Sequence, residues 1–197
     1  MSYALGLTGS IGMGKSATAQ IFAEEGCAVW DADAAVHRLY DVGGAAVAPI
    51  GDAWPAAVIE GRVDRGRLRD IIAGDRSALP RIEKIVHPLV AADREAFRAS
   101  SSHDVLVFDI PLLFETGGDA GMDAVACVWI SDETQRQRVL ARKTMTVEQF
   151  EQILQKQMPI EDKKARADYL IETDTPDHAK AQVRSILAQI RRQIADA

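Results

Sequence analysis

Residues 9–16 read GSIGMGKS, a segment from which the fold class can be inferred. It matches the phosphate-binding pattern G-x-x-x-x-G-K-[ST] at every position. The preceding run, Tyr3 to Thr8, is apolar and typical of a buried strand. The following run, Gly14 to Glu25, has helical periodicity and ends at Gly26. The pattern therefore lies between a strand and a helix, which is the context that a phosphate-binding loop requires.

The residue types in this loop suit a triphosphate. Glycines let the backbone approach phosphate oxygens, and consecutive N–H groups at a helix N-terminus bind anions. Lys15 is predicted to contact the β- and γ-phosphates, and the Ser16 hydroxyl to ligate Mg²⁺. A glycine-rich turn with a coincidental lysine does not explain a complete pattern. The predicted ATP-binding residues of the loop are Ser10, Ile11, Gly12, Met13, Gly14, Lys15, Ser16 and Ala17.

The loop indicates nucleotide binding but leaves the reaction open, because switches, motors and kinases all use it. A guanine-nucleotide switch normally carries N-K-x-D, and this sequence has no asparagine. A small-molecule kinase therefore fits best. The alternatives are a shikimate-type kinase with a compact acceptor site, and a switch or assembly ATPase without a small-molecule product.

Composition is that of an ordinary globular protein. Of 197 residues, 47% are hydrophobic and 26% charged, and the net charge of −6 argues against general binding to nucleic acid or an anionic membrane. The only cysteines, Cys27 and Cys127, are expected to be buried thiols in a reducing compartment. No apolar run approaches the roughly 18 residues of a membrane span, so we expect a cytoplasmic protein. The oligomeric state stays open.

Apolar strands alternating with helices predict an α/β fold, a P-loop kinase core with a parallel five-stranded sheet flanked by helices. The expected strands are 3–8, 28–30, 105–108, 124–130 and 169–171. The core comprises 1–33, 105–131 and 165–197. Two helical insertions interrupt it, a substrate domain at 34–104 and a lid at 132–164.

Several local features of the insertions and the last helix are predicted in more detail. We expect no strand in the 34–104 insertion, and we expect His87-Pro88 to mark a helix end, because proline disfavours helical backbone in the residue before it. Thr175 and Pro176 fit the N-cap and first position of a final helix.

Three aspartates follow predicted strands. Asp31 and Asp33 come after the second strand, and alternation puts both side chains on one side if that strand runs so far. Asp33 is the candidate base for an acceptor hydroxyl, and the alternative is that it caps a helix beginning near Ala34. Asp109 ends an apolar strand and is a candidate for holding Mg²⁺ through a water, or else a turn residue.

Two further segments are candidates for the site. Arg138 and Arg142 are four residues apart, so they share one helix face and fit a cationic lid over a phosphoryl group. The alternative is a solvated face whose arginines pair with acidic neighbours. Residues 111–115, PLLFE, are either a packing wall or an acceptor-binding wall that includes Leu112.

The sequence resembles the dephospho-coenzyme A kinase family along nearly its whole length. The matching segments are GLTGSIGMGKS at 6–16, DADAAVHRL at 31–39, IVHPLV at 85–90, DIPLLFE at 109–115, QRQRVLAR at 135–142 and ADYLIET at 167–173. The resemblance implies ATP-dependent phosphorylation of the ribose 3′-hydroxyl of dephospho-coenzyme A, the last step of coenzyme A biosynthesis.

The resemblance also implies roles for individual residues. It puts Thr8, Asp33 and His87 on the acceptor side with Asp33 as base, and Arg142 among the ATP-binding and catalytic residues together with Lys15. Leu112 of the PLLFE segment is a further candidate for acceptor binding. The chain departs from the family at Ser10, often glycine, at Met13, often serine, and at Glu172-Thr173, often Asp-Asn, in a region the family has near the adenine.

Overall fold

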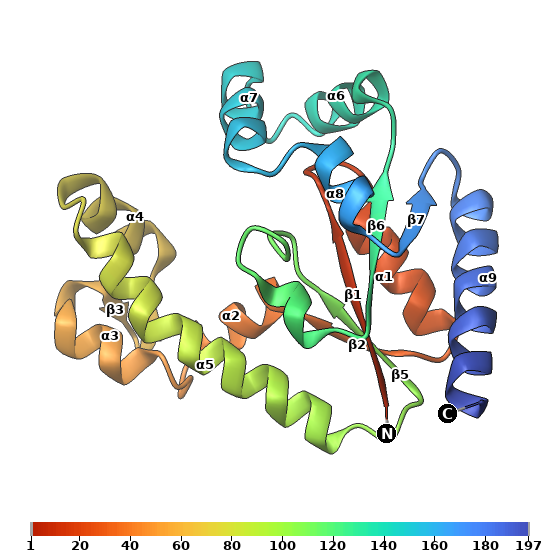
Figure 1. The fold of residues 1–197 in the computed structure, drawn as a ribbon. Coiled ribbons are helices and arrows are strands. Elements are labelled where there is room, and N and C mark those ends of the chain that lie inside the picture. Colours follow the sequence, from red (N-terminus) through yellow and green to blue (C-terminus); the bar gives the residue numbers. More distant parts are fainter. Residues whose placement is uncertain (1, 197) are drawn as a thin grey trace. The chain divides into compact units, whose positions relative to one another are not determined.

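A computed structural model describes residues 2–196 of the chain (Figure 1) and divides into two compact units. The first unit contains both ends of the chain, up to Trp30 and from Ser101 onward. The second unit is Asp31–Ser100. Each unit has a hydrophobic cluster of its own, so each is a body with its own core.

The first unit is built on a five-stranded sheet with the order β2-β5-β1-β6-β7. The parallel sheet flanked by helices that the sequence predicts is confirmed. In the central strand, β1, Leu7 pairs with Asp109 of β5 on one side and with Ala126 of β6 on the other. The carboxyl ends of β1 and β5 are therefore neighbours. The strands are β1 (Tyr3–Gly9), β2 (Ala28–Asp31), β5 (Val105–Asp109), β6 (Ala124–Trp129) and β7 (Tyr169–Glu172).

Helices α1 (Lys15–Glu24) and α9 (Pro176–Ala195) pack beside each other in this unit (Figure 1). The predicted cap of α9 is confirmed, because the Thr175 hydroxyl accepts from His178 N at 3.2 Å. Its apolar stripe is buried against the sheet through Ala179, Val183, Ile186, Leu187 and Ile190. Both cysteines are buried free thiols, as expected, and burial raises the pKa of each to about 11.

The polar stretch after β6 forms three short helices, α6 (Asp132–Ala141), α7 (Val147–Lys156) and α8 (Ile160–Arg166). Side-chain caps begin the first two. The Ser131 hydroxyl accepts from Thr134 N, and Thr146 and Gln149 form a reciprocal capping box. Residues Gly118–Gly121, after β5, form a short 3₁₀ helix, η2. No helix among residues 2–196 has the length and apolar character to cross a bilayer.

The second unit is mostly helical, but the expectation that it contains no strand is wrong. Strands β3 (Val58–Ile59) and β4 (Arg62–Val63) form an antiparallel hairpin around Glu60 and Gly61, which both have positive φ. Two-residue strands are too short to show the alternation of apolar and polar residues by which a strand is recognised in sequence. The other elements are α2 (Ala32–Tyr40), α3 (Val47–Ala53), η1 (Pro55–Ala57), α4 (Arg65–Gly74) and α5 (Ala78–Ser100).

The prediction that His87-Pro88 ends a helix is also wrong. Pro88 lies inside α5, which continues to Ser100. Proline removes one helical hydrogen bond and normally kinks or breaks a helix. The long apolar stripe around it, including Ile82 and Val86, packs into the core of the second unit. This burial keeps the helix continuous past the proline.

Candidate functional site

The phosphate-binding loop joins β1 to α1 and depends on two glycines. Gly12 and Gly14 have φ of 75° and 86°, a left-handed conformation that residues with a Cβ rarely adopt. A Cβ on Gly12 would collide with Val139, and one on Gly14 would approach the Thr173 Oγ1 to 3.1 Å. The loop conformation therefore requires glycine at both positions.

The N-terminus of α1 is suited to an anion. Gly14 is its N-cap, and no side chain in the described structure caps the helix. The amides of a helix's first turn have no partner within the helix, and the helix dipole adds positive potential there. The amides of Lys15, Ser16 and Ala17 belong to this turn. This end of the helix therefore has the donors that a phosphate group needs.

Lys15 is paired with Asp109 across the carboxyl ends of β1 and β5. Its ammonium group donates to the Asp109 carboxylate, whose side chain is only 1% exposed. The sheet register explains the proximity, since Asp109 lies beside Leu7, just before the loop. The structure thus brings together the predicted phosphate-binding lysine and the predicted metal-side carboxylate. Their contacts with ATP and Mg²⁺ stay predictions.

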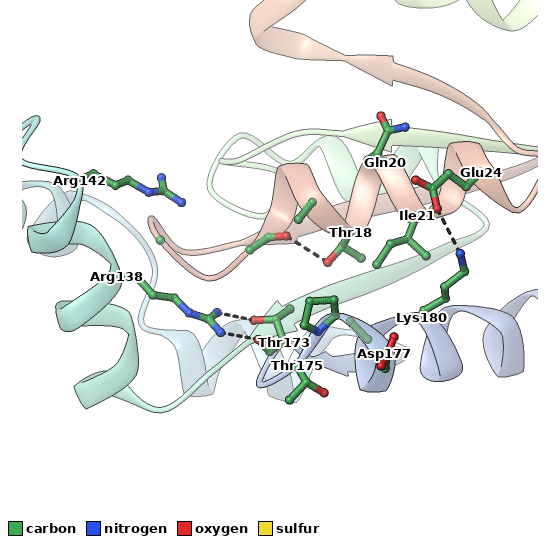
Figure 2. A pocket seen from close by; sticks show the side chains of 15 residues that line it. Thr18, Gln20, Ile21, Glu24, Arg138, Arg142, Thr173, Thr175, Asp177 and Lys180 are labelled. Carbon is green, nitrogen blue, oxygen red and sulfur yellow. Dashed lines mark hydrogen bonds and ion pairs between the residues drawn. The ribbon is translucent and has the colours of Figure 1, made fainter.

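A cavity of about 560 Å³ opens beside α1 (Figure 2). Its volume is within the range of roughly 300–1,000 Å³ for small-molecule sites. The loop and α1, helix α6, and the start of α9 all contribute to its wall. Its lining includes Gly12, Gly14, Ala17, Thr18, Ile21, Arg138, Arg142, Thr173, Thr175 and Pro176. Three segments that are distant in sequence therefore form one pocket around the loop.

Arg138 of α6 and Arg142, the C-cap residue of that helix, have different environments, which Figure 2 shows from close by. Arg138 donates to Thr173 Oγ1 at 3.2 Å, to Thr173 O at 2.7 Å and to Asp174 O at 3.3 Å. Arg142, at the end of the helix, is exposed and lines the cavity, and it has no ion pair within the described part of its unit. Arg138 therefore holds the wall, and Arg142 is available to a ligand.

Thr173 links the cavity wall to the phosphate-binding loop. It is 8% exposed, and its hydroxyl donates to Met13 O at 2.9 Å. Its backbone N–H donates to Trp129 O at 3.0 Å, which continues the pairing of β7 with β6. Sequence reasoning noted this position only as a departure from the family. Its bond to Met13 joins residues 160 positions apart, so no local pattern reveals it.

The segment after β5 is attached to α8 by a buried ion pair. Lys163 is fully buried and donates to Pro111 O at 3.0 Å and to the Glu115 carboxylate at 2.9 Å. The same Pro111 carbonyl accepts from the buried hydroxyl of Thr8 at 3.1 Å, and Met158 N donates to Glu115 at 2.8 Å. Desolvation acts to raise the pKa of Glu115, but these hydrogen bonds outweigh it and lower the pKa below its usual value.

Part of the PLLFE segment is a packing wall, one of the two alternatives that the sequence left open, and acceptor binding by this segment stays a prediction. Leu113 and Phe114 are buried in a small apolar cluster with Val125. Leu112 is 41% exposed, so it is free to contact a ligand. Sequence reasoning missed Lys163 because it lies in a charged run, IEDKKAR, where each lysine alone suggests a surface position.

Asp31 and Asp33 belong to the second unit and have different environments. Strand β2 ends at Asp31 and does not reach Asp33, so the condition under which both side chains would share one side of the strand is not met. Asp31 is the N-cap of α2, and its Oδ1 accepts from Ala34 N at 2.8 Å. The alternative interpretation, in which Asp33 caps this helix, is therefore wrong. Asp33 lies exposed in the first turn, and His87 lies exposed on α5. Acceptor-side roles for both stay predictions.

Comparisons with known proteins agree with one another. The family model described as dephospho-CoA kinase matches residues 3–178. A protein of Ruegeria pomeroyi named dephospho-CoA kinase is 66% identical, with 97% of each chain covered. A solved structure from Thermus thermophilus has a TM-score of 0.84 at 28% identity, covering 95% of this chain and 97% of that one. Dephospho-CoA kinase from Campylobacter jejuni has a TM-score of 0.72 at 22% identity, covering 98% and 99%, and supports the fold alone.

Proposed function

The chain belongs to the dephospho-CoA kinase family, and on that premise we propose that it transfers the γ-phosphoryl group of ATP to the ribose 3′-hydroxyl of dephospho-CoA. The products are CoA and ADP. One observation carries the assignment to ATP chemistry. The uncapped N-terminus of α1 opens beside a cavity that also receives the exposed Arg142.

ATP would bind along the first unit with its two ends in different environments. The triphosphate is proposed to lie on the loop amides and Lys15, where hydrogen-bond donors and positive charge are concentrated. The adenine is proposed to lie in the cavity of Figure 2, whose wall includes Ile21 and Pro176. An apolar pocket next to a phosphate site suits a flat base attached to a charged tail.

In the proposed transfer the acceptor 3′-oxygen attacks the γ-phosphorus while the bond from that phosphorus to the β-bridging oxygen breaks. The proton of the hydroxyl passes to Asp33, and the bond's electrons leave with ADP. Lys15 and Arg142 offset the charge that develops on the phosphoryl oxygens. The exposed carboxylate of Asp33, with the capping role taken by Asp31, supports its assignment as base.

Acceptor binding is proposed for Thr8, His87 and Leu112. Leu112 is exposed next to Pro111, and the Pro111 carbonyl accepts a hydrogen bond from the Thr8 hydroxyl, so this bond links Thr8 to the segment that carries Leu112. His87 lies in the second unit, which we propose binds the acceptor.

Mg²⁺ is proposed to accompany ATP, and the residues present suit it. Ser16 and Asp109 offer a hydroxyl and a carboxylate, the oxygen ligands that Mg²⁺ prefers. When bound, the ion neutralises part of the charge on the phosphates. Ser16 would ligate it directly and Asp109 through a water.

Acceptor dependence tests the proposal. The purified protein is mixed with ATP and Mg²⁺, and ADP is measured with dephospho-CoA, with shikimate and with no acceptor. We expect ADP only with dephospho-CoA, together with a product heavier by one phosphoryl group. A shikimate-type kinase responds to shikimate, and a switch or assembly ATPase hydrolyses ATP at the same rate in all three mixtures. Dephospho-CoA lacking the 3′-hydroxyl tests the position of transfer, and its phosphorylation would contradict the proposed site.

A further inference from the structure

Ile11, in the first half of the phosphate-binding loop, has both backbone polar groups bonded to glutamine side chains. Its N–H donates to Oε1 of Gln157 at 3.1 Å. Its carbonyl accepts from Nε2 of Gln135 at 2.7 Å. Gln135 lies on α6 and Gln157 directly follows α7. We call these two residues the glutamine clamp.

Burial and packing make the clamp a specific contact. Gln135 is 2% exposed, so its carboxamide is removed from water and depends on the Ile11 carbonyl as partner. The neighbouring Gly12 lies against Val139 of the same helix so closely that no Cβ fits between them. Helix α6 thus contacts two consecutive residues of the loop. The bonds span 146 and 124 positions of sequence, so they arise from the fold.

The two bonds have opposite polarity. At position 157 the side chain must accept a hydrogen bond, whereas at position 135 it must donate one. Glutamine satisfies both requirements because its carboxamide has one acceptor and one donor end. The orientation of the Ile11 peptide is fixed by this pairing. The next amide, at Gly12, shares its peptide unit with the Ile11 carbonyl and is the one directed toward the triphosphate under the proposed function, whereas the Met13 N–H donates to Ser10 O at 3.2 Å.

We propose that Gln135 and Gln157 are positioning residues for phosphoryl transfer, which hold the Ile11 peptide and couple the loop to the segment bearing Arg142. This inference rests on the proposed function. The α1 amides of Lys15 and Ser16 still bind phosphate when the clamp is broken. Loss of the clamp therefore lowers kcat more than it weakens ATP binding.

Glutamate and methionine substitutions separate hydrogen-bond polarity from side-chain size. Gln157→Glu retains an acceptor for Ile11 N–H, so kcat stays within about threefold, while its negative charge raises KM for ATP in a salt-sensitive way. Gln157→Met removes the acceptor and lowers kcat about tenfold or more, the equivalent of one lost hydrogen bond. Gln135→Glu replaces the donor with a carboxylate facing the Ile11 carbonyl, and it also lowers kcat about tenfold or more.

Matched controls use exposed glutamines on the same helices. Gln152 on α7 and Gln137 on α6 have no contact with the loop in the described structure, and both are exposed. Gln152→Glu, Gln152→Met and Gln137→Glu keep kcat and KM within about twofold. Melting temperatures are measured for every variant, so that a loss of folded protein is separated from a loss of turnover.

Amide exchange gives a readout that is independent of catalysis. The Ile11 N–H is expected to be protected from hydrogen exchange in the native protein and in Gln157→Glu, and unprotected in Gln157→Met. If the native protein phosphorylates no acceptor, the proposed function fails, and the inference about transfer fails with it even where exchange shows the bond. If transfer is normal in the native protein and kcat is unchanged in both Gln157→Met and Gln135→Glu, the positioning role alone is overturned.

Discussion

Removal of one partner from the buried ion pair between Lys163 and Glu115 is expected to lower the stability of the protein strongly. Lys163 is fully buried, and the Glu115 side chain is 17% exposed. Substitution of Lys163 by methionine keeps most of the side-chain volume but removes the charge and three hydrogen-bond donors. The Glu115 carboxylate then keeps only backbone donors, the N–H groups of Met158 and of Glu115 itself, and Pro111 O keeps its hydrogen bond from Thr8.

The cost of the Lys163→Met change follows from these contacts. Removing one partner of a buried ion pair costs about 3–5 kcal/mol, because the other charge stays buried without compensation. The remaining Met158 bond and the partial exposure of Glu115 put the expected value at the lower end, about 3 kcal/mol. For a chain of this size each kcal/mol lowers Tm by about 2–4 °C, so we expect a decrease of roughly 6–12 °C.

The neighbouring Lys164 provides the control. It contacts Glu161, which is 77% exposed, and lies 4.3 Å from the Trp129 ring centroid. Exposed pairs and cation–π contacts contribute about 1 kcal/mol or less, so Lys164→Met should lower Tm by only a few degrees. Thermal unfolding followed by circular dichroism measures both variants. Equal decreases in Tm would refute the reasoning.

A double variant tests whether the uncompensated charge of Glu115 causes the loss of stability in Lys163→Met. Adding Glu115→Gln to Lys163→Met removes the lone charge while it keeps an acceptor for Met158 N. Since the cost comes from an uncompensated carboxylate, the double variant should be more stable than Lys163→Met alone. A double variant that is less stable than Lys163→Met would show that the charge is not the source of the loss.

Three further predictions concern catalysis and pH. Asp33→Asn should fold and bind ATP but lower kcat by about 10²-fold or more, the scale of a lost general base, and near-normal turnover would remove Asp33 from that role. Arg142→Met should lower kcat with little change in Tm, because its side chain is exposed, and steady-state kinetics with thermal unfolding checks both parts. The folded-state pKa of Glu115 is lowered, so its stabilising contribution is present above the usual value of 4.5 and is lost as pH falls through the folded pKa. Urea unfolding between pH 3 and 7 should therefore show a smaller decrease in the free energy of unfolding at low pH for Glu115→Gln than for the native chain. Parallel curves of unfolding free energy against pH would contradict this.

The features that sequence predicts well are those that local pattern determines. The phosphate-binding loop is one contiguous motif, α1 follows it directly, and α9 carries its own cap and apolar stripe. The apolar runs of β1 and β5 read as buried strands, and the sheet places them side by side. Each of these elements can be predicted from the residues of one loop, one helix or one strand.

The features that sequence misses depend on burial or on distant partners. Pro88 indicates a helix end by local rules, yet the packed stripe of α5 keeps the helix continuous. Asp31 and Asp33 are equally good capping residues in sequence, and only the end of β2 determines that Asp31 takes the cap. Lys163 and the glutamine clamp are polar residues in polar segments, and their partners lie 48 to 146 positions away.

Arg138 and Arg142 show what kind of knowledge the structure adds to a motif. They have the same chemistry, the same helix and nearly the same face, so sequence alone predicts the same role for both. In the structure Arg138 is bound to the carbonyls of Thr173 and Asp174, and these bonds orient the wall on which Thr173 holds Met13. Arg142, one turn later, has no such acceptors among residues 2–196 and remains exposed at the cavity. The arginine that supports the cavity wall and the arginine that is exposed at the cavity are therefore one turn apart. A residue's role in this site follows from the acceptors that the fold places around it, and residue type alone does not determine it.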